Sequence, residues 1–279
     1  NSLNVLVASK TTNGSGIYSF SAAEAPAAGL PIRLEFTVNP GDQPSKRVNA
    51  DRTNIQFVVP GPAAVNVDFA VASKKSFSDN ANPYVATTAF TNGNAMSSGS
   101  NTAGDKNNLY IFPYDLSNDG GSTRRAKNQY LGSIFGLAWQ RESRVLLMSA
   151  YLKRHVGFGP GGIGAIYQSQ ISAAGVPATP SLLVNVAAIG IDVGANPRTT
   201  TLPDNPKSPN TDAGVFSEVG KRGIGGIDIS NDGKDLYIIN MFEKKLHRIN
   251  IGNPLKSSFS AADVTGNWVI PDPAAAGTI

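Results

Sequence analysis

The feature that most constrains this chain is an internal repeat whose two copies lie 90 residues apart. Residues 136–151 read GLAWQRESRVLLMSAY, and residues 226–241 read GIDISNDGKDLYIINM, aligned without a gap. Each copy starts with glycine, continues as an apolar strand, reverses in a short polar turn and returns as a second apolar strand. A third strand follows at 166–171 and at 246–251, an offset of 80 residues. The first copy therefore carries ten extra residues, within 154–164.

A strand–turn–strand–turn–strand unit that recurs along a chain is typical of β-propeller blades. Because blades usually repeat every ~40–50 residues, an offset of 90 residues corresponds to two blades, or to one blade plus an excursion. Segment 196–210 is a candidate excursion, since it carries four prolines and no strand pattern. We therefore expect propeller-type blades in the second part of the chain, forming either a complete or a truncated ring.

The remaining sequence is rich in strand signals and poor in helical ones. Glycine (29) and proline (18) interrupt most stretches of the 279 residues, and few windows have the apolar spacing of an amphipathic helix. Two short helices are expected, at 21–28 and 257–264. The expected strands are 3–8, 16–20, 32–38, 54–59, 66–72, 109–112, 134–139, 145–151, 164–171, 181–193, 225–229, 236–241 and 246–251. The predicted fold class is all-β.

Strand spacing also suggests how the chain is divided. Five expected strands fall within residues 1–75, at the spacing of a small β-sandwich. Ser, Asn, Thr and Gly dominate residues 92–108, where strand signal almost disappears, so we predict a linker over 76–108. The propeller-like region follows over 109–279.

Composition excludes several functional classes. The chain has no cysteine, which excludes a disulfide framework, a zinc–cysteine site and a thiol nucleophile. The net charge is only +4 and the basic residues form small clusters, so we expect no nucleic-acid partner. No apolar run approaches the ~18 residues of a membrane helix, so no transmembrane segment is expected. The chain starts at Asn1 without a leader pattern, and we expect a processed mature chain or a piece of a longer one.

Two motifs resemble ligand sites but favour simpler interpretations. Residues 157–162 have the spacing G-x-G-x-x-G, yet Pro160 removes an amide and another strand follows instead of a helix, so we interpret them as a flexible loop. Asp228 and Asp232 lie in a sequence like the start of a calcium loop, but position twelve is Ile239 instead of a carboxylate. An Asn-Asp-Gly turn between two strands explains these residues better than calcium does.

The two histidines of the chain are His155 and His247. Neither belongs to a G-x-S-x-G or H-E-x-x-H motif, so the sequence contains no recognisable hydrolase site. His247 alternates with apolar residues, as in a strand. His155 opens the glycine-rich loop, and we expect it to contact partners together with Arg154 and Phe158.

Aromatic residues are the other candidate binding groups. At strand spacing they more often fill the space between blades than form a sugar-stacking surface. The residues concerned are Tyr110, Phe112, Tyr114, Trp139, Tyr151, Tyr167 and Tyr237.

Two parts of the sequence resemble a known family. Residues 16–20 (GIYSF) and 31–37 (PIRLEFT) are similar to the B-type repeat of bacterial serine–aspartate-repeat adhesins, in which a G-x-Y-x-F strand precedes a y-R-v-E-F strand in a prealbumin-like sandwich. Residues 54–58 (NIQFV) resemble a later strand of that repeat. Segments 150–167 and 220–230 resemble large bacterial surface proteins that join such a domain to a propeller-like region.

The resemblance implies an exported protein with a surface, adhesive or assembly role and no catalytic residues to carry over. Some adhesin B repeats bind calcium through acidic loops, but residues 1–75 lack the matching acidic cluster. Relatives often have cysteines near positions 80–95, where this chain has none. Relatives also continue well past the equivalent of Pro271.

These observations predict a non-enzymatic extracellular or cell-surface bacterial protein. Its expected partners are other protein chains, matrix or glycans, in a homo-oligomer or larger assembly, with no cofactor. One alternative is a propeller hydrolase or lactonase whose channel metal is held by groups among Asp192, Asp228, His155 and Asn240. Another is a carbohydrate-binding module with an exposed row of aromatic residues.

Overall fold

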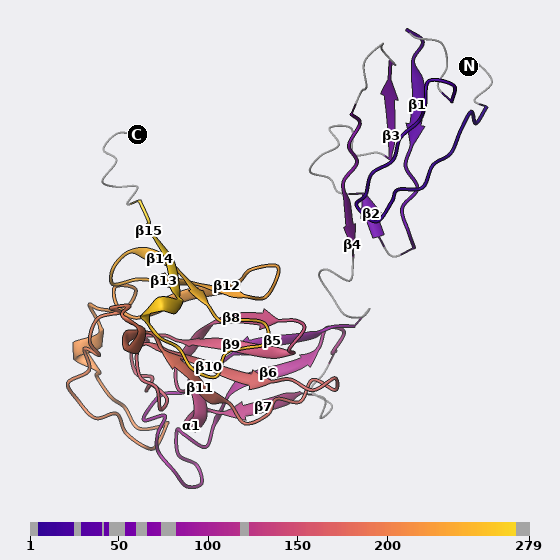
Figure 1. The fold of residues 1–279 in the computed structure, drawn as a ribbon. Helices are drawn as coiled ribbons and strands as arrows, with labels where there is room; N and C mark the ends of the chain where they lie inside the picture. Colours follow the sequence, from indigo (N-terminus) through magenta and orange to yellow (C-terminus); the bar gives the residue numbers. More distant parts are fainter. Residues whose placement is uncertain are drawn as a thin grey trace, which may run out of the picture. The chain divides into compact units, whose positions relative to one another are not determined.

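The computed structural model describes residues 5–24, 29–40, 42–44, 54–59, 66–73, 82–117 and 123–271. The chain is all-β and divides into two compact units, Asn1–Pro83 and Tyr84–Ile279 (Figure 1). Among the described residues, no helix has the length and hydropathy required to span a bilayer.

The described residues of the first unit form two short antiparallel pairs. Strand β1 (Ile32–Glu35) pairs with β3 (Ile55–Val58), and β2 (Asp42–Pro44) pairs with β4 (Val71–Ser73). Aromatic rings pack beside them: Phe36 and Phe69 stack with centroids 4.4 Å apart, and Tyr18 meets Phe36 edge-on at 5.8 Å. The Tyr18 hydroxyl donates to the Val67 carbonyl at 2.6 Å, and burial raises the pKa of Tyr18. Aromatic contacts thus stabilise this unit alongside its short strands.

The second unit contains three larger antiparallel sheets. The first sheet is β5 (Tyr84–Thr88), β6 (Asn107–Pro113) and β7 (Arg124–Lys127), followed by the short helix α1 (Asn128–Leu131). The second is β8 (Ile134–Gln140), β9 (Val145–Ala150), β10 (Ala165–Gln170) and β11 (Ser181–Asn185). The third is β12 (Ile224–Ile229), β13 (Asp235–Asn240), β14 (Lys245–Asn250) and β15 (Val264–Val269). Short 3₁₀ helices join them: η2 (Val186–Ile189), η3 (Ala213–Val215) and η4 (Ala261–Asp263).

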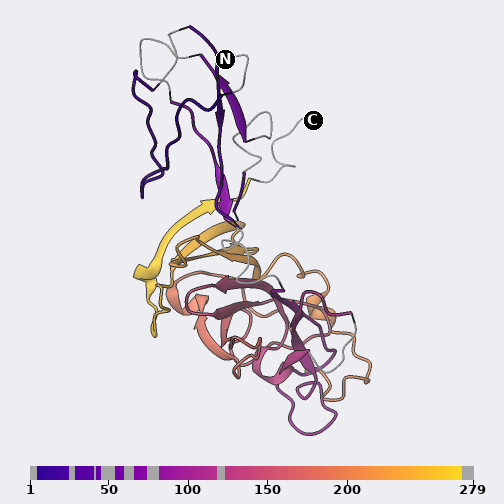
Figure 2. The ribbon, with the colours of Figure 1, turned by 90° about the vertical axis from the view of Figure 1, so that its right-hand side faces the viewer.

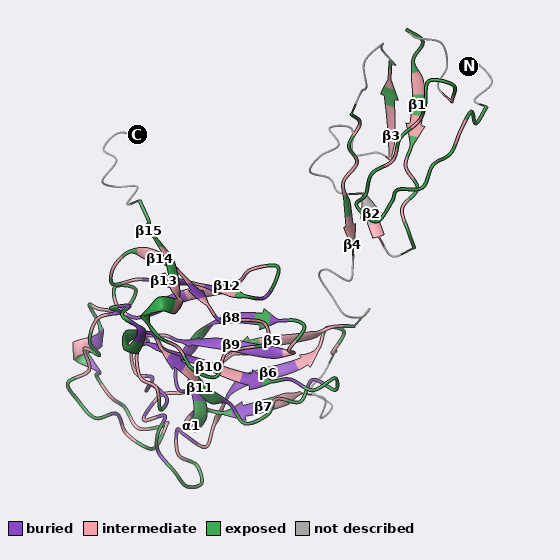
Figure 3. Ribbon diagram, in the orientation of Figure 1, coloured by how far each residue is buried: buried purple, intermediate pink, exposed green. Residues whose placement is uncertain are grey.

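The three sheets pack one after another, with β8–β11 in the middle. One apolar cluster joins Leu109 of β6 to Met148 of β9, and a second joins Leu147 of β9 to Leu236 and Ile238 of β13. Both faces of β9 are therefore covered, and all six of its residues are buried (Figure 3). In contrast, β15 forms an edge of its sheet, at the periphery of the second unit (Figure 2). The core of the second unit therefore lies between its sheets.

The two repeat copies have the same strand register. Ile134 pairs with Ala150 in the first copy, and Ile224 pairs with Asn240 in the second, both at an offset of 90 residues. In both copies the pairing register then shifts at the same place, between Ile134 and Leu137 in β8 and between Ile224 and Ile227 in β12. Ile166 pairs with Ser149 and Leu246 with Ile239, which confirms the offset of 80 for the third strand. The ten extra residues of the first copy lie in the β9–β10 connection.

Several predicted boundaries differ from the structure. The predicted linker over 76–108 is wrong for 84–108, because Tyr84–Thr88 forms β5 and Ala95 and Ala103 are fully buried in the loop that follows. Polar composition hid a segment whose small side chains allow close packing. Residues 5–8 and 16–20 form no strand; residues 3 and 4 lie outside the described part.

The predicted helices and one long strand also need correction. Within 21–28, residues 22–24 form a turn and 25–28 lie outside the described part, while 257–264 contains only η4. The strand predicted over 181–193 ends at Asn185, where the Asn185 side chain accepts a hydrogen bond from the Ala187 amide and begins η2. Strands β2, β5, β7 and β15 were not predicted.

Candidate functional site

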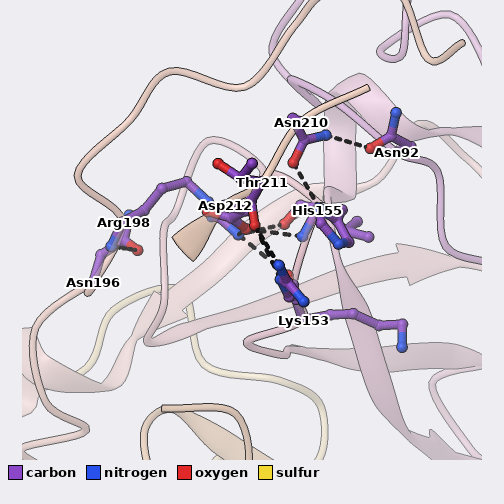
Figure 4. Close-up of polar contacts among 10 residues, drawn as sticks. Asn92, Lys153, His155, Asn196, Arg198, Asn210, Thr211 and Asp212 are labelled. Atoms are coloured by element: carbon purple, nitrogen blue, oxygen red, sulfur yellow. Dashed lines mark hydrogen bonds and ion pairs between the residues drawn. The ribbon is translucent and has the colours of Figure 1, made fainter. Parts of the chain in front are cut away.

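The predicted contact residues Arg154, His155 and Phe158 lie in the loop that joins β9 to β10, residues 151–164. Figure 4 shows His155 of this loop beside Asn210 and Asp212. This loop contains the ten residues that the second copy lacks. It packs against the Pro-rich excursion between η2 and η3. The contacts between the two loops define what these residues can do.

A buried ion pair joins the two loops. Arg198 donates through Nε and Nη2 to the two carboxylate oxygens of Asp212, at 3.0 and 2.9 Å, and their side chains are 8% and 1% exposed. Arg198 also donates to the Val156 carbonyl at 3.0 Å and lies over the Phe158 ring at 5.5 Å. Because both charges are removed from water, the pair is costly to break on one side only.

Asp212 also holds His155 in place. The His155 amide donates to Asp212 Oδ2 at 2.8 Å. Both residues have left-handed backbones, with φ of +70° and +38°, a region that non-glycine residues rarely adopt. Hydrogen bonds compensate this local strain and fix the direction of the loop.

The His155 ring extends this network to a third segment. Its Nδ1 lies 2.7 Å from Asn210 Oδ1, and the Asn210 amide donates to Asn92 Oδ1 at 2.6 Å. Asn92 in turn donates to the Pro206 and Ser208 carbonyls. Through its ring nitrogen, His155 therefore connects its own loop to the Pro-rich excursion and, through Asn210, to Asn92.

Arg154 and Phe216 are more accessible. Arg154 donates twice to the Thr211 carbonyl, at 3.0 and 2.8 Å, and its guanidinium lies 5.0 Å from the centre of the Phe216 ring. Phe216 is 70% exposed. A cation over an exposed ring is a feature that a partner surface can recognise.

The glycine-rich loop allows close packing and does not form a phosphate cradle. A Cβ on Gly159 would lie 2.6 Å from the Leu131 carbonyl carbon, and one on Gly157 would lie 2.7 Å from the Ala95 amide. The following strand is β10, whereas a dinucleotide site needs a helix there. The prediction of a loop between strands is confirmed, and the loop is well packed.

Asp228 and Asp232 belong to the β12–β13 hairpin. Asp228 Oδ1 accepts from the Ile229 amide, and Asp232 Oδ1 accepts from Ser230 Oγ at 2.6 Å and from the Lys234 amide. The Ser230 hydrogen bond holds the pKa of Asp232 below its usual range. The predicted hairpin turn is confirmed. Among the described residues, no group of three His, Asp or Glu side chains is placed to hold a metal ion.

The other candidate ligands of a channel metal, Asp192, Asn240 and His155, lie in two separate places. The Asn240 amide donates to the Asp192 backbone carbonyl and to Glu243 Oε2, both at 2.8 Å. Glu243 Oε2 also lies 2.9 Å from Nε2 of the buried His247. These contacts brace the β13–β14 turn, whereas His155 belongs to the loop network described above.

The aromatic residues divide between core and surface. Tyr167 is fully buried, accepts a hydrogen bond from the Gly161 amide, and has its pKa raised to about 12 by burial. Tyr114 is 72% exposed, and Trp139 is 37% exposed with Arg144 over its ring at 5.8 Å. Tyr114 follows β6, whereas Trp139 lies in β8 and Tyr167 in β10, so these side chains do not make one continuous row along a single strand.

The face of sheet β12–β15 that points away from β8–β11 is the least covered apolar surface of the repeat. In the first copy, the positions that face the next sheet are buried: Ala138, Val145, Leu147, Ser149 and Ile166. Their counterparts in the second copy are exposed or half-buried: Asp228, Asp235, Tyr237, Ile239 and Leu246. Trp268, opposite Leu246, is 49% exposed. A groove of about 560 Å³ hollows one end of this face, lined among others by Ile239, Met241, Phe242 and Ile270.

Paired glycines show the difference between the two faces most clearly. A Cβ on Gly136 would lie 2.5 Å from Ser149 Oγ and 3.0 Å from both Cγ1 and the amide of Ile227, so glycine lets β12 approach β8. Gly226 occupies the same place in the second copy, and a Cβ there would have no atom within 4 Å among the described residues. Neither glycine needs a positive φ. Gly136 thus lies in a close contact between two sheets, whereas its counterpart Gly226 lies on a face against which no described residue packs.

Sequence reasoning singled out Arg154, His155 and Phe158 as candidates for contacts but missed the residues that hold them. Arg198, Asp212, Asn92 and Asn210 join segments up to 118 residues apart, and no local pattern marks such pairs. The repeat did contain the signal for the open face, since Gly136 and Gly226 align in it.

Comparison with known proteins gives limited matches. No protein-family model matches the chain. Colossin-D of Dictyostelium discoideum is 32% identical over 134 residues, which cover 46% of this chain and 13% of Colossin-D. A solved structure of a luciferin-regenerating enzyme aligns with a TM-score of 0.31 and 11% identity, covering 78% of this chain and 57% of that one. The chain therefore spans about an eighth of the curated relative and just over half of the structural neighbour.

Proposed function

We propose that this chain is a non-enzymatic extracellular structural or adhesive protein of the bacterial cell surface that acts by assembling with copies of itself. The proposal includes a prealbumin-like sandwich in the first unit and propeller-type blades in the second. The resemblance to serine–aspartate-repeat adhesins supports the extracellular location. The strongest support for assembly is the contrast between Gly136, closely packed, and Gly226, open.

The physical argument rests on the stacking of the sheets. Each inter-sheet interface buries large apolar side chains, such as Leu147 and Leu236, and such burial is the main favourable term in protein association. The outer face of β12–β15 has the same backbone register but leaves Tyr237, Ile239 and Trp268 partly in water. A further sheet that packs there would remove this apolar area from solvent.

The test is sedimentation velocity of the purified chain over a concentration series. We expect self-association beyond the 29.1 kDa monomer. Gly226→Val should weaken it, because the valine would project into the open space above β12. Gly14→Val is the matched control, since Gly14 also has open space and no positive φ but lies in the first unit. A chain that stays monomeric up to its solubility limit would contradict the proposal, as would equal effects of the two variants.

A further inference from the structure

Sheet β5–β7 has an incompletely covered face of its own, on the side that points away from β8–β11. Leu109, Ile111 and Ala126 belong to the apolar cluster that this sheet shares with β9 and β10. Because side chains alternate along a strand, the residues between them point to the opposite face. The residues of that face are Val85, Thr87, Tyr110, Phe112 and Arg125. Thr87 and Arg125 are exposed, and the other three are half-buried.

The strands of this sheet correspond to the last three strands of a repeat copy. Thr88 of β5 pairs with Leu109 of β6, as Ser149 of β9 pairs with Ile166 of β10. Leu109 and Ile166 each belong to the cluster shared with the sheet that follows along the chain. Strand β5 therefore corresponds to β9 and β13, and β6 corresponds to β10 and β14.

This correspondence shows that the open face of β5–β7 is one that the other two sheets bury. The pair Thr87–Tyr110 matches the pairs Met148–Tyr167 and Ile238–His247, and the pair Val85–Phe112 matches Leu146–Ser169 and Leu236–Ile249. All eight matching residues of the other two sheets are at most 5% exposed. In those sheets a preceding sheet covers these positions, whereas in β5–β7 the same positions are partly in water.

The two ends of the stack therefore carry the two halves of one kind of interface. Within the chain, the face of one sheet that points to the next sheet packs on the face of that next sheet that points back, and this happens twice. The forward face of β12–β15, around Gly226 and Tyr237, is open. The backward face of β5–β7 is the surface that packs on a forward face by the same rule. Two forward faces do not pack together anywhere in the described part of the chain.

We infer that the chain assembles head to tail, with the open face of β5–β7 of one copy packed on the open face of β12–β15 of the next. The contact is heterologous, because two different surfaces meet in it. Each added copy brings one new open face of each kind, so assembly ends only when a ring closes and otherwise gives a filament. Thr87, Tyr110 and Phe112 of one copy then share a buried interface with Tyr237 and Ile239 of the next.

This inference rests on the proposed function, because it names the surface that occupies the face around Gly226. It makes self-association depend on a second set of residues, in β5–β7. A dimer in which two β12–β15 faces meet would satisfy the proposed function as well, but it would leave β5–β7 out of the contact. Experiments on β5–β7 therefore separate the two ideas.

The first experiment mixes two variants that each block one of the two faces. Thr87→Glu adds bulk and charge at an exposed position of β5, and Gly226→Val does the same for bulk at β12. In sedimentation velocity, each variant alone should self-associate at least tenfold more weakly than the parent. Ser181→Glu is the matched control for Thr87→Glu, because Ser181 is an exposed strand residue of the middle sheet. It should associate as the parent does.

The equimolar mixture is the decisive sample. The Gly226→Val copy keeps an intact β5–β7 face, and the Thr87→Glu copy keeps an intact β12–β15 face. The mixture should therefore form a complex of one copy of each variant at concentrations where either variant alone is monomeric. Such rescue also shows that both variants are folded. A contact between two identical faces would give no rescue.

The second experiment needs no substitution. Hydroxyl-radical labelling of the parent chain is compared between the monomer and the assembled state. Labelling should fall by at least half at Tyr110 and Phe112 of one face and at Tyr237 and Trp268 of the other. Phe216, a loop residue that is 70% exposed, is the internal control and should be labelled equally in both states.

The outcomes distinguish this inference from the proposed function. A parent chain that stays monomeric overturns both. Association that Gly226→Val weakens and Thr87→Glu does not, or labelling that falls at Tyr237 and stays constant at Tyr110 and Phe112, overturns the head-to-tail contact and leaves self-assembly standing. A mixture without rescue has the same meaning when both variants unfold at the parent's urea midpoint. If either variant unfolds earlier, the labelling result decides.

Discussion

The sheets β8–β11 and β12–β15 have the same register and the same irregularity in their first strands, yet their burial differs. Leu147 is fully buried, whereas its counterpart Tyr237 is half-buried. Because the paired backbones are alike, the difference arises from what packs on each sheet. Register is determined by the apolar pattern and the turns, while burial of the second face requires a neighbouring sheet. The repeat sequence alone therefore specifies the strand register, whereas the neighbouring sheet determines whether the second face is buried.

The largest expected effect concerns the β9–β10 loop, which contains the ten residues that only the first copy has and which Asp212 holds in place. Asp212→Asn should lower the free energy of unfolding by about 3–5 kcal/mol, because it leaves the buried Arg198 guanidinium without its counter-charge. Amide exchange should speed up in the β9–β10 loop and stay unchanged in the short β13–β14 turn. Urea unfolding and amide exchange measure the two effects. Asp204→Asn is the control, since Asp204 contacts Asn94 at the exposed surface of the same excursion; a similar loss in both variants would show that the buried pair does not hold the loop.

A pair of truncations in β9 and β13 compares the two copies directly. Leu147→Ala removes a side chain with no exposed surface and should cost about 2–5 kcal/mol, including the cavity left between two sheets. Tyr237→Ala, at the aligned position, should cost about 1 kcal/mol or less in the monomer because its outer side faces water. Thermal or urea unfolding at a concentration where the chain is monomeric measures both. Equal losses would mean that the outer face of β12–β15 is covered in the monomer.

The aligned glycines provide a smaller but cleaner comparison. Gly136→Ala should destabilise the chain by about 1–3 kcal/mol, as other overpacking changes do, because its Cβ would press on Ser149 and Ile227. Gly226→Ala should stay within about 0.5 kcal/mol of the parent, as expected for a surface substitution. The midpoint of urea unfolding measures both. The explanation by close approach fails if Gly136→Ala is as stable as Gly226→Ala.

The repeat copies were predictable because their signals are local. Alternating apolar residues and the Asn231-Asp232-Gly233 turn specify β12 and β13, and the gap-free alignment placed β8 and β9 correctly. The apolar pattern of each strand lies within a few neighbouring residues, so a short window contains the whole pattern. Correct strand positions then followed from the period of the repeat.

What sequence reasoning missed depends on contacts between distant segments. Strand β5 is a single five-residue segment whose partner strand β6 begins only after a long polar loop, and that loop concealed the pairing. Arg198 and Asp212 look like surface charges in a Pro-rich loop, and only the folded chain shows them buried together. The site residues His155 and Phe158 were predicted as a contact loop, but their packing was not, because no window contains both loops.

The smallest expected effect is a pH dependence that belongs to the second copy. Lys256 and the Ser260 amide donate to the Asp263 carboxylate at 2.6 and 2.8 Å, and these contacts hold the pKa of Asp263 below its usual range. A carboxylate with a lowered folded-state pKa contributes stability that is present above its unfolded pKa and is lost as the pH falls through the folded value. In the first copy, the segment that precedes the fourth strand β11, residues 172–180, contains no Asp or Glu.

Acidification should therefore speed amide exchange in β15, which follows η4, before it affects β11. The measurement is amide exchange over a pH series, corrected for the intrinsic rate at each pH. Asp263→Asn should have faster exchange in β15 already at neutral pH and a flatter dependence on acid. If β15 in Asp263→Asn responds to acid as steeply as in the parent, another carboxylate near β14 and β15 is responsible, and the two copies differ at their ends for a reason other than this cap.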